Sequence, residues 1–113
     1  MASARDDGKS TVPVPADAVG AYYVAGSLYV IAQGVAYGGT TDIRIEREPF
    51  LGGLKFAVKG ELDHVAGFQP YCVEYVEKIE IPSRAVPSKS IVFEDANLHL
   101  VGSVIPIQFF GLG

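Results

Sequence analysis

Three polar side chains with potential for chemistry, Glu61, Asp63 and His64, lie in one short segment, and His99 lies farther along the chain. Carboxylates and imidazoles in this combination could bind a metal ion or transfer protons. A solvated polar loop explains the same residues more simply, and His99, which is flanked by leucines, is expected to face solvent. We therefore predict no catalytic residue, no metal site and no cofactor.

The single cysteine, Cys72, excludes an internal disulfide and a cysteine-based zinc cluster. Its neighbour Glu74 has the wrong charge to activate a thiolate, so we predict that Cys72 is a small buried hydrophobic residue. Ser27 follows Gly26 but lacks the second glycine of a nucleophile elbow. No phosphate-binding Gly-x-Gly-x-x-Gly motif lies between an expected strand and a helix.

The aromatic residues give a stronger signal, because the chain contains six tyrosines and six phenylalanines. Tyrosine combines apolar area with a hydroxyl group, which suits a ligand-binding surface. The candidate ligand-binding residues are Tyr22, Tyr29, Tyr37, Tyr71 and His64. Ordinary sheet packing and an interface are the favoured explanation for these rings, and the absence of tryptophan argues against carbohydrate stacking.

The composition narrows the choice of partners. Charged residues make up 19% of the chain, against about a quarter in typical soluble domains, while hydrophobic residues reach 49%. This balance indicates either a very full core or apolar surface reserved for a partner. The net charge of −4 and the scattered basic residues argue against nucleic-acid binding.

Two further expectations concern the membrane and the compartment. No apolar run approaches the eighteen or so residues of a spanning helix, so no membrane span is expected. The first ten residues lack the apolar segment of a signal peptide. We expect a cytoplasmic protein, and a secreted protein trimmed from a longer precursor is the alternative.

The elements that must position these residues are strands. Val and Ile total 22 against 7 Leu, and branching at Cβ suits a pleated sheet. Residues 1–18 are expected to form a flexible N-terminal arm, within which Thr11–Pro15 could lie extended along a sheet edge. Residues 19–113 are then a single β domain, a size typical of one domain.

Individual runs show period two, the pattern of a strand. The run from Leu28 to Tyr37 is apolar on both faces, and its small residues would let another layer approach closely. Thr41–Arg47 alternates and predicts a half-buried strand, which Gly52-Gly53 would join to the next strand through a two-residue hairpin turn. For residues 71–81 we favour a strand, with a helix as the alternative.

Seven or eight short strands at this spacing predict an all-β fold, namely an antiparallel two-layer β-sandwich. An immunoglobulin-like topology is one form of such a sandwich, although the chain lacks the paired cysteines and core Trp of antibody domains. A small β-barrel is the alternative architecture.

These observations support two hypotheses about function. The favoured one is a non-enzymatic β domain that works through protein association, either as a homo-oligomer, most simply a dimer, or within a larger complex. The alternative is a small-molecule or carbohydrate-binding domain, or a small enzyme, that uses a tyrosine-lined pocket and the loop from Glu61 to His64. A flat apolar sheet face would favour the first, and a concave pocket that joins those groups would favour the second.

Overall fold

The computed structural model describes residues 10–51, 53–62, 67–81, 89–97 and 103–110. Within these ranges all regular secondary structure is β-strand. The predicted all-β class is therefore confirmed. In chain order the strands are β1 (Ser10–Pro13), β2 (Ala18–Val24), β3 (Ser27–Tyr37), β4 (Thr40–Glu48), β5 (Lys55–Leu62), β6 (Phe68–Lys78), β7 (Ser90–Glu94) and β8 (Ser103–Phe110).

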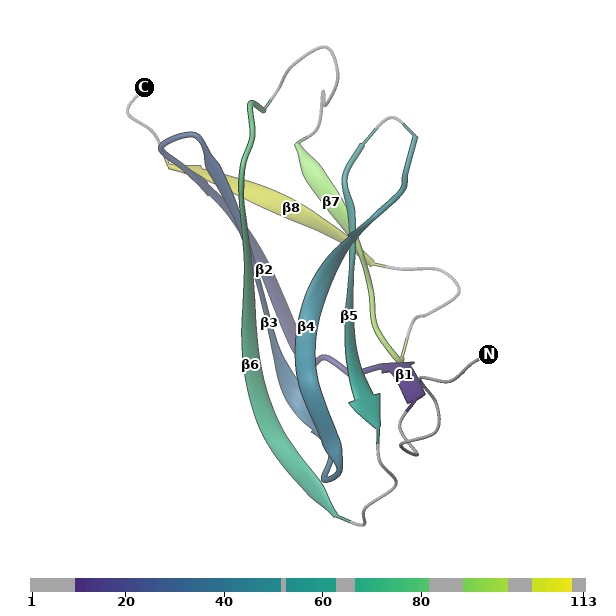
Figure 1. Ribbon diagram of the computed structural model, residues 1–113. Helices are drawn as coiled ribbons and strands as arrows, with labels where there is room; N and C mark the ends of the chain where they lie inside the picture. The colour runs from purple at the N-terminus through teal and green to yellow at the C-terminus, as the bar shows by residue number, and fades with distance from the viewer. Residues whose placement is uncertain (1–9, 52, 63–66, 82–88, 98–102, 111–113) are drawn as a thin grey trace.

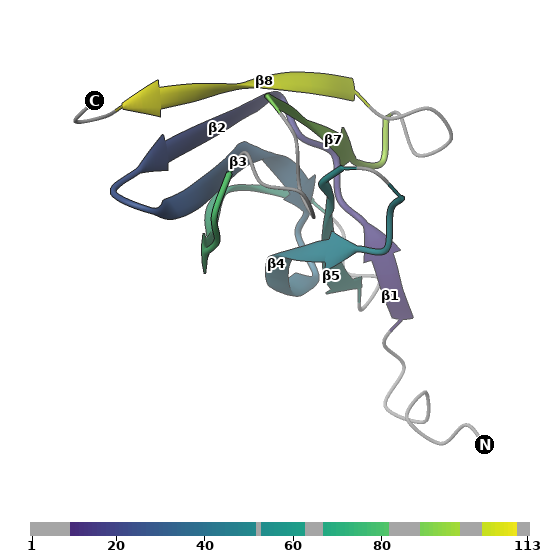
Figure 2. The same ribbon diagram turned by 90° about the horizontal axis from the view of Figure 1, so that it is seen from above.

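The described strands form one continuous curled sheet, where the sequence predicts two separate layers (Figures 1 and 2). The path through the sheet is β1-β5-β7-β8-β2-β3-β6, with β4 paired to the other side of β5. Two of the pairs, β5–β7 and β2–β8, are parallel, so the prediction of a purely antiparallel fold is wrong. The immunoglobulin-like sandwich is not confirmed, and the observed half-barrel is nearer to the barrel alternative.

Strand β8 is the physical reason for the single sheet, because it belongs to both halves. Residues Ser103–Pro106 lie opposite β7, and Ile107–Phe110 lie beside β2. Pro106 is the last residue paired with β7, so its missing backbone N–H falls where the strand changes partner. We call β1, β4, β5 and β7 the charged flank, and β2, β3, β6 and the second half of β8 the apolar flank.

The core lies on the inner side of the curled sheet, between the two flanks. Alternation along Thr41–Arg47 and the strand that follows it predicts that Ile43, Ile45, Phe56 and Val58 share one core face, and the structure places all four there, with Ile43 only partly buried. Both flanks contribute the fully buried side chains, among them Leu28, Val30, Phe56, Val58 and Ile91.

The β4–β5 hairpin differs from the predicted two-residue turn at Gly52-Gly53. Glu48 and Lys55 form the last pair of this ladder, so residues 49–54 make up the connection. Pro49 has no backbone N–H to donate and follows the last paired residue directly, which explains why the ladder stops before the glycines.

Strand β6 settles the ambiguous segment at residues 71–81, because Phe68–Lys78 is a strand and not a helix. Its burial alternates throughout. Tyr71, Val73 and Tyr75 pack against the core, whereas the intervening residues are exposed. Period two therefore predicted this element better than the helical spacing.

Part of the predicted N-terminal arm belongs to the sheet. Ser10–Pro13 pair with β5 as β1, and Val14 is fully buried. The connector after Val14 passes close to β3, where a Cβ atom on Gly34 would meet the Pro15 carbonyl oxygen at 2.8 Å. The expected close approach of another segment to the small residues of β3 is thus seen at Gly34.

Candidate functional site

The outer side of the apolar flank carries a nearly continuous set of apolar side chains. Cross-strand pairs place Tyr22 opposite Tyr29, and Tyr29 opposite Val76. Phe68 is 71% exposed, Tyr37 53% and Phe110 51%. We define the outer apolar face as Tyr22, Val24, Tyr29, Ile31, Val35, Tyr37, Phe68, Pro70, Cys72, Val76 and Phe110.

Aromatic rings on this face contact one another across neighbouring strands. The ring centroids of Tyr22 and Phe110 lie 6.3 Å apart, and those of Tyr37 and Phe68 lie 5.6 Å apart. Such pairs stabilise the local arrangement by roughly 0.5–1.5 kcal/mol. Tyr37, Phe68 and Phe110 nevertheless keep about half or more of their surface exposed to solvent, so the face is ordered but uncovered.

Charge is scarce on this surface. Among the described strand residues on the outer side of the apolar flank, only Glu74 and Lys78 are charged, and both lie on β6. The solvent-accessible surface of this face is therefore mostly apolar. Such a composition is typical of a contact surface.

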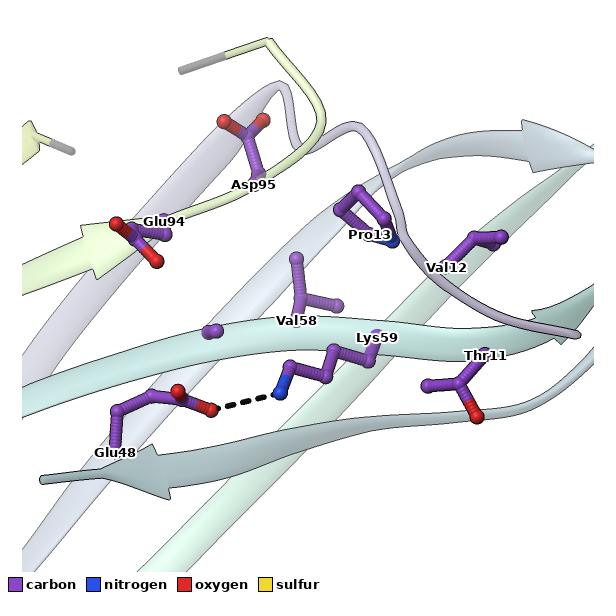
Figure 3. A pocket seen from close by; sticks show the side chains of 9 residues that line it. Thr11, Val12, Pro13, Glu48, Val58, Lys59, Glu94 and Asp95 are labelled. Carbon is purple, nitrogen blue, oxygen red and sulfur yellow. Dashed lines mark ion pairs between the residues drawn. The ribbon is translucent and has the colours of Figure 1, made fainter. Parts of the chain in front are cut away.

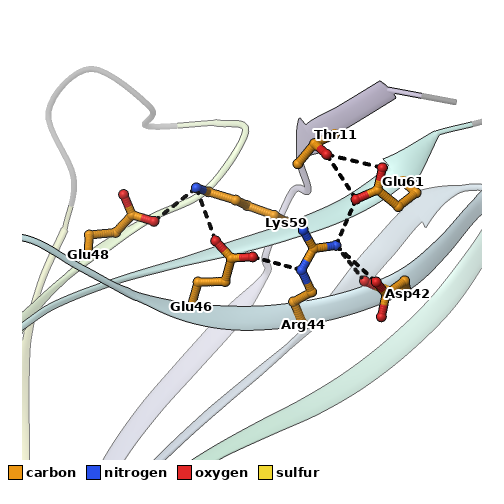
Figure 4. A network of polar contacts seen from close by, with 7 residues as sticks. All are labelled: Thr11, Asp42, Arg44, Glu46, Glu48, Lys59 and Glu61. Carbon is orange, nitrogen blue, oxygen red and sulfur yellow. Dashed lines mark hydrogen bonds and ion pairs between the residues drawn. The ribbon is translucent and has the colours of Figure 1, made fainter. Parts of the chain in front are cut away.

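The outer side of the charged flank has the opposite character (Figure 4). Arg44 forms ion pairs with Glu46 at 2.8 Å and with Glu61 at 3.0 Å. Lys59 pairs with Glu48 at 2.9 Å and with Glu46 at 3.3 Å. Arg44 and Lys59 are partners in the β4–β5 ladder, and the carboxylates around them give each side chain of the network an opposite charge within reach.

This network changes the proton affinities of its members. The hydrogen bond from Arg44, together with Lys59, holds the pKa of Glu46 below its usual value, although partial burial opposes the shift. The hydrogen bond to Glu48 raises the pKa of Lys59, again against partial burial. Both shifts favour the charged forms, as expected for a structural ion-pair network.

A groove of about 280 Å³ lies beside this network, between the end of β1 and the end of β7 (Figure 3). Its charged lining residues already have partners within the protein. Lys59 is bound by Glu48, and Glu94 accepts an ion pair from Lys55 at 3.1 Å. The Oδ2 atom of Asp95 accepts a hydrogen bond from the Ala16 backbone N–H at 2.6 Å. These contacts fix the connector to β7, so the groove is best explained as structural.

The structure does not bring the predicted ligand-binding tyrosines together. Tyr22, Tyr29 and Tyr37 belong to the outer apolar face, on β2 and β3. Tyr71 lies on the inner side of β6, where its hydroxyl donates to the Pro15 carbonyl at 2.6 Å. Burial, with a smaller contribution from Asp95, raises the pKa of Tyr71, as expected for a neutral structural hydroxyl.

The polar segment predicted as a solvated loop is only partly described. Glu61 lies at the end of β5, where it accepts hydrogen bonds from Thr11 and Arg44. Asp63, His64 and His99 lie outside the described residues. In the part of the chain that the structure describes, no group of three or more His, Cys, Asp or Glu side chains is placed to hold a metal ion.

The prediction that Cys72 is buried is wrong, because its side chain is exposed on the outer apolar face. Even-numbered positions of β6 face outward, and position 72 is one of them. The described residues also include no helix that is long and apolar enough to cross a membrane.

Comparison with protein-family models, with curated proteins and with solved structures finds no match to this chain. Its function therefore has to be inferred from its own residues, and the outer apolar face is the surface that lacks a structural explanation.

Proposed function

We propose that this protein is a non-enzymatic β domain that acts through self-association, with the outer apolar face as the contact surface. One observation supports this most directly. The outer side of the apolar flank exposes large rings such as Phe68 and Tyr37, whereas the outer side of the charged flank is covered by paired charges. A monomer that needed only solubility would be expected to carry polar residues on both outer sides.

The size of the surface fits an interface. The exposed parts of its aromatic rings and valines amount to on the order of 500 Å² of apolar area. A standard interface buries about 800 Å² per partner, of which roughly 60% is apolar. The outer apolar face, with its polar surroundings, supplies about this amount.

A second copy of the chain suits this surface. The partner has to present apolar side chains and few charges, so that no charge is buried without a counter-charge. A two-fold arrangement meets this requirement because it brings the same face of both copies together. Symmetric dimers are also the commonest soluble oligomers.

The test is the molar mass in solution, measured by light scattering up to high micromolar concentration. We expect a mass above the 12.0 kDa of one chain for the wild type. Val35→Lys, on the outer apolar face opposite Pro70, should lower the mass at the same concentration. Thr41→Lys is the matched control, because it adds the same side chain to an exposed strand position of the charged flank.

Two results would contradict the proposal. A wild type that remains at 12.0 kDa over the whole concentration range would overturn the proposal. An equal loss of mass in Val35→Lys and Thr41→Lys would show that association does not depend on the outer apolar face. Circular dichroism of both variants checks that each retains its strand content.

A further inference from the structure

Strand β6 is an edge of the described sheet, and one row of its backbone groups has no ladder partner among the described strands. It ends the strand order and pairs only with β3 among the described strands. Ile79 donates its backbone N–H to the Gly26 carbonyl at 3.1 Å, so backbone groups at odd positions of β6 point toward β3. Those of Cys72, Glu74, Val76 and Lys78 therefore point to the open edge. Such an edge is a template for pairing with another chain.

The nearest neighbour on that side, β4, bridges to β6 through side chains and not through a backbone ladder. The Gln69 side chain donates to the Thr40 carbonyl at 2.6 Å at one end of the two strands. At the other end the long side chain of Arg47 reaches Glu77. Figure 1 shows β4 and β6 clearly separated at this upper end. The second half of the β6 edge, from Glu74 to Lys78, is thus the more open one.

We propose that the open edge of β6 pairs with the same edge of a second copy, in an antiparallel ladder centred on Val76. In this ladder Glu74 of one copy lies opposite Lys78 of the other, and Val76 lies opposite Val76. The contact rests on the proposed self-association and adds a second interface to it: this one uses the backbone edge of β6, whereas the first uses the side chains of the outer apolar face, to which Val76 also belongs. The two contacts can therefore fail separately.

Proline restricts the register of such a ladder. Pro70 lies on the same edge but has no backbone N–H, so registers that pair the first half of β6 lose a hydrogen bond there. A ladder centred on Val76 leaves Pro70 outside the paired residues. Proline on an edge strand normally discourages pairing, and here it does so only at one end of the strand.

The two charges of β6 select the same register. Glu74 and Lys78 are four residues apart and face the same side of the sheet. Antiparallel pairing about Val76 places each opposite its counter-charge in the other copy, twice because of the two-fold symmetry. Pairing about Glu74 would instead place two carboxylates opposite each other. One acid and one base at these positions are therefore self-complementary in one register.

A charge-reversal series measures this pairing through the dissociation constant of the dimer, by sedimentation equilibrium. Lys78→Glu places like charges at both symmetric pairs and should raise the dissociation constant about tenfold. Glu74→Lys should do the same, and the double variant Glu74→Lys/Lys78→Glu should return to within about threefold of the wild type. Lys89→Glu is the matched control, since it makes the same charge change at an exposed position before β7 and should have no effect.

A crosslink tests the centre of the ladder. In an antiparallel hydrogen-bonded pair the two Cα atoms lie about 5.5 Å apart, within the range that a disulfide spans. Val76→Cys in a Cys72→Ser background should therefore oxidise to a covalent dimer. Val104→Cys in the same background is the control, because Val104 is 70% exposed but lies on β8, in the part that pairs with β7.

The possible results separate the two proposals. A wild type that is monomeric throughout overturns both of them. A wild-type dimer whose dissociation constant is unchanged by either single reversal overturns the edge pairing alone. Equal crosslinking of the Val76→Cys and Val104→Cys variants would likewise overturn it, whereas rescue in the double reversal supports the Val76 register.

Discussion

The two flanks of the half-barrel bury their inner sides against the same core but treat their outer sides in opposite ways. On the charged flank, Arg44, Glu46 and Lys59 interact with one another across β4 and β5. On the apolar flank, the outward positions of β2 and β3 are mostly Tyr, Val and Ile, with Tyr37 about half exposed and Tyr22 and Tyr29 partly buried. Both flanks are built from paired strands, with one register shift in the β4–β5 ladder, so the difference lies mainly in the side chains.

This contrast shows that burial within the fold does not account for every apolar residue of the strands. A sheet with one buried face needs apolar residues at every second position only. The charged flank follows that rule, and β3 does not, because Tyr29, Val35 and Tyr37 add a second apolar row. Among the described strands, most of the exposed large apolar side chains thus lie on the apolar flank, as expected for a contact surface, and Val104 on the first half of β8 is an exception.

The largest expected effect concerns the core that the two flanks share. Phe56 of the charged flank is fully buried, and its ring centroid lies 5.1 Å from that of Tyr75 on the apolar flank. Phe56→Ala should lower the free energy of unfolding by roughly 3–5 kcal/mol, because it empties a packed aromatic site between the flanks. Urea denaturation measures this change. Phe50→Ala, at a ring that is 48% exposed, is the control and should cost far less; equal losses would show that the flanks do not share a core.

A second prediction uses Cys72, the chain's single thiol, as a probe of the apolar flank. Its side chain is exposed on one copy, so alkylation should be fast in dilute protein. Self-association would cover it, and the rate should fall about tenfold once about nine-tenths of the chains are associated. Val35→Lys should react quickly at every concentration. A wild-type rate that does not depend on concentration would contradict coverage of this flank.

The sequence predicted those features of the two flanks that follow from the alternation of residues along a strand. Alternation placed Ile45, Phe56 and Val58 together in the core, and it showed that Leu28–Tyr37 is apolar on both faces. It could not predict that β8 changes partner at Pro106, because pairing with β7 and then with β2 depends on contacts distant in sequence. For this reason the structure does not confirm the two-layer sandwich.

The candidate surface was only partly predictable. The tyrosines of β2 and β3 are evident in the sequence, but Gly67 and Pro70 favour a loop at Phe68. In the structure Phe68 continues the outward row of β6 and contacts Tyr37. The residue type of Cys72 favours burial, whereas its even position on β6 shows that it faces outward.

The pH dependence of stability tests the ion-pair network of the charged flank. The pKa of Glu46 is lowered in the folded state, so its contribution is present above its ordinary value of 4.5 and is lost as the pH falls through the folded pKa. The pKa of Lys59 is raised, so its contribution is present below 10.5 and is lost as the pH rises through the folded pKa. The midpoint of urea unfolding should therefore decline on both sides of this window. In Glu46→Gln the decline on the acid side should be shallower, and an identical acid limb would show that Glu46 does not contribute.

The smallest expected effects concern two arginines of β4. Arg44 belongs to the ion-pair network of the charged flank, and Arg47 links the two flanks. Arg44 lies among Asp42, Glu46 and Glu61, and its loss would leave these carboxylates without their shared cation. Arg44→Met should therefore lower the free energy of unfolding by roughly 0.5–1 kcal/mol. Arg47 has one ion pair, with Glu77 on β6, so Arg47→Met should cost less, about 0.3 kcal/mol. Urea denaturation of both variants in low and high salt provides the measurement, because added salt should reduce the Arg44 effect more. A larger loss of unfolding free energy in Arg47→Met than in Arg44→Met would contradict this order. It would show that the ion pair between the flanks contributes more to stability than the network on the charged flank.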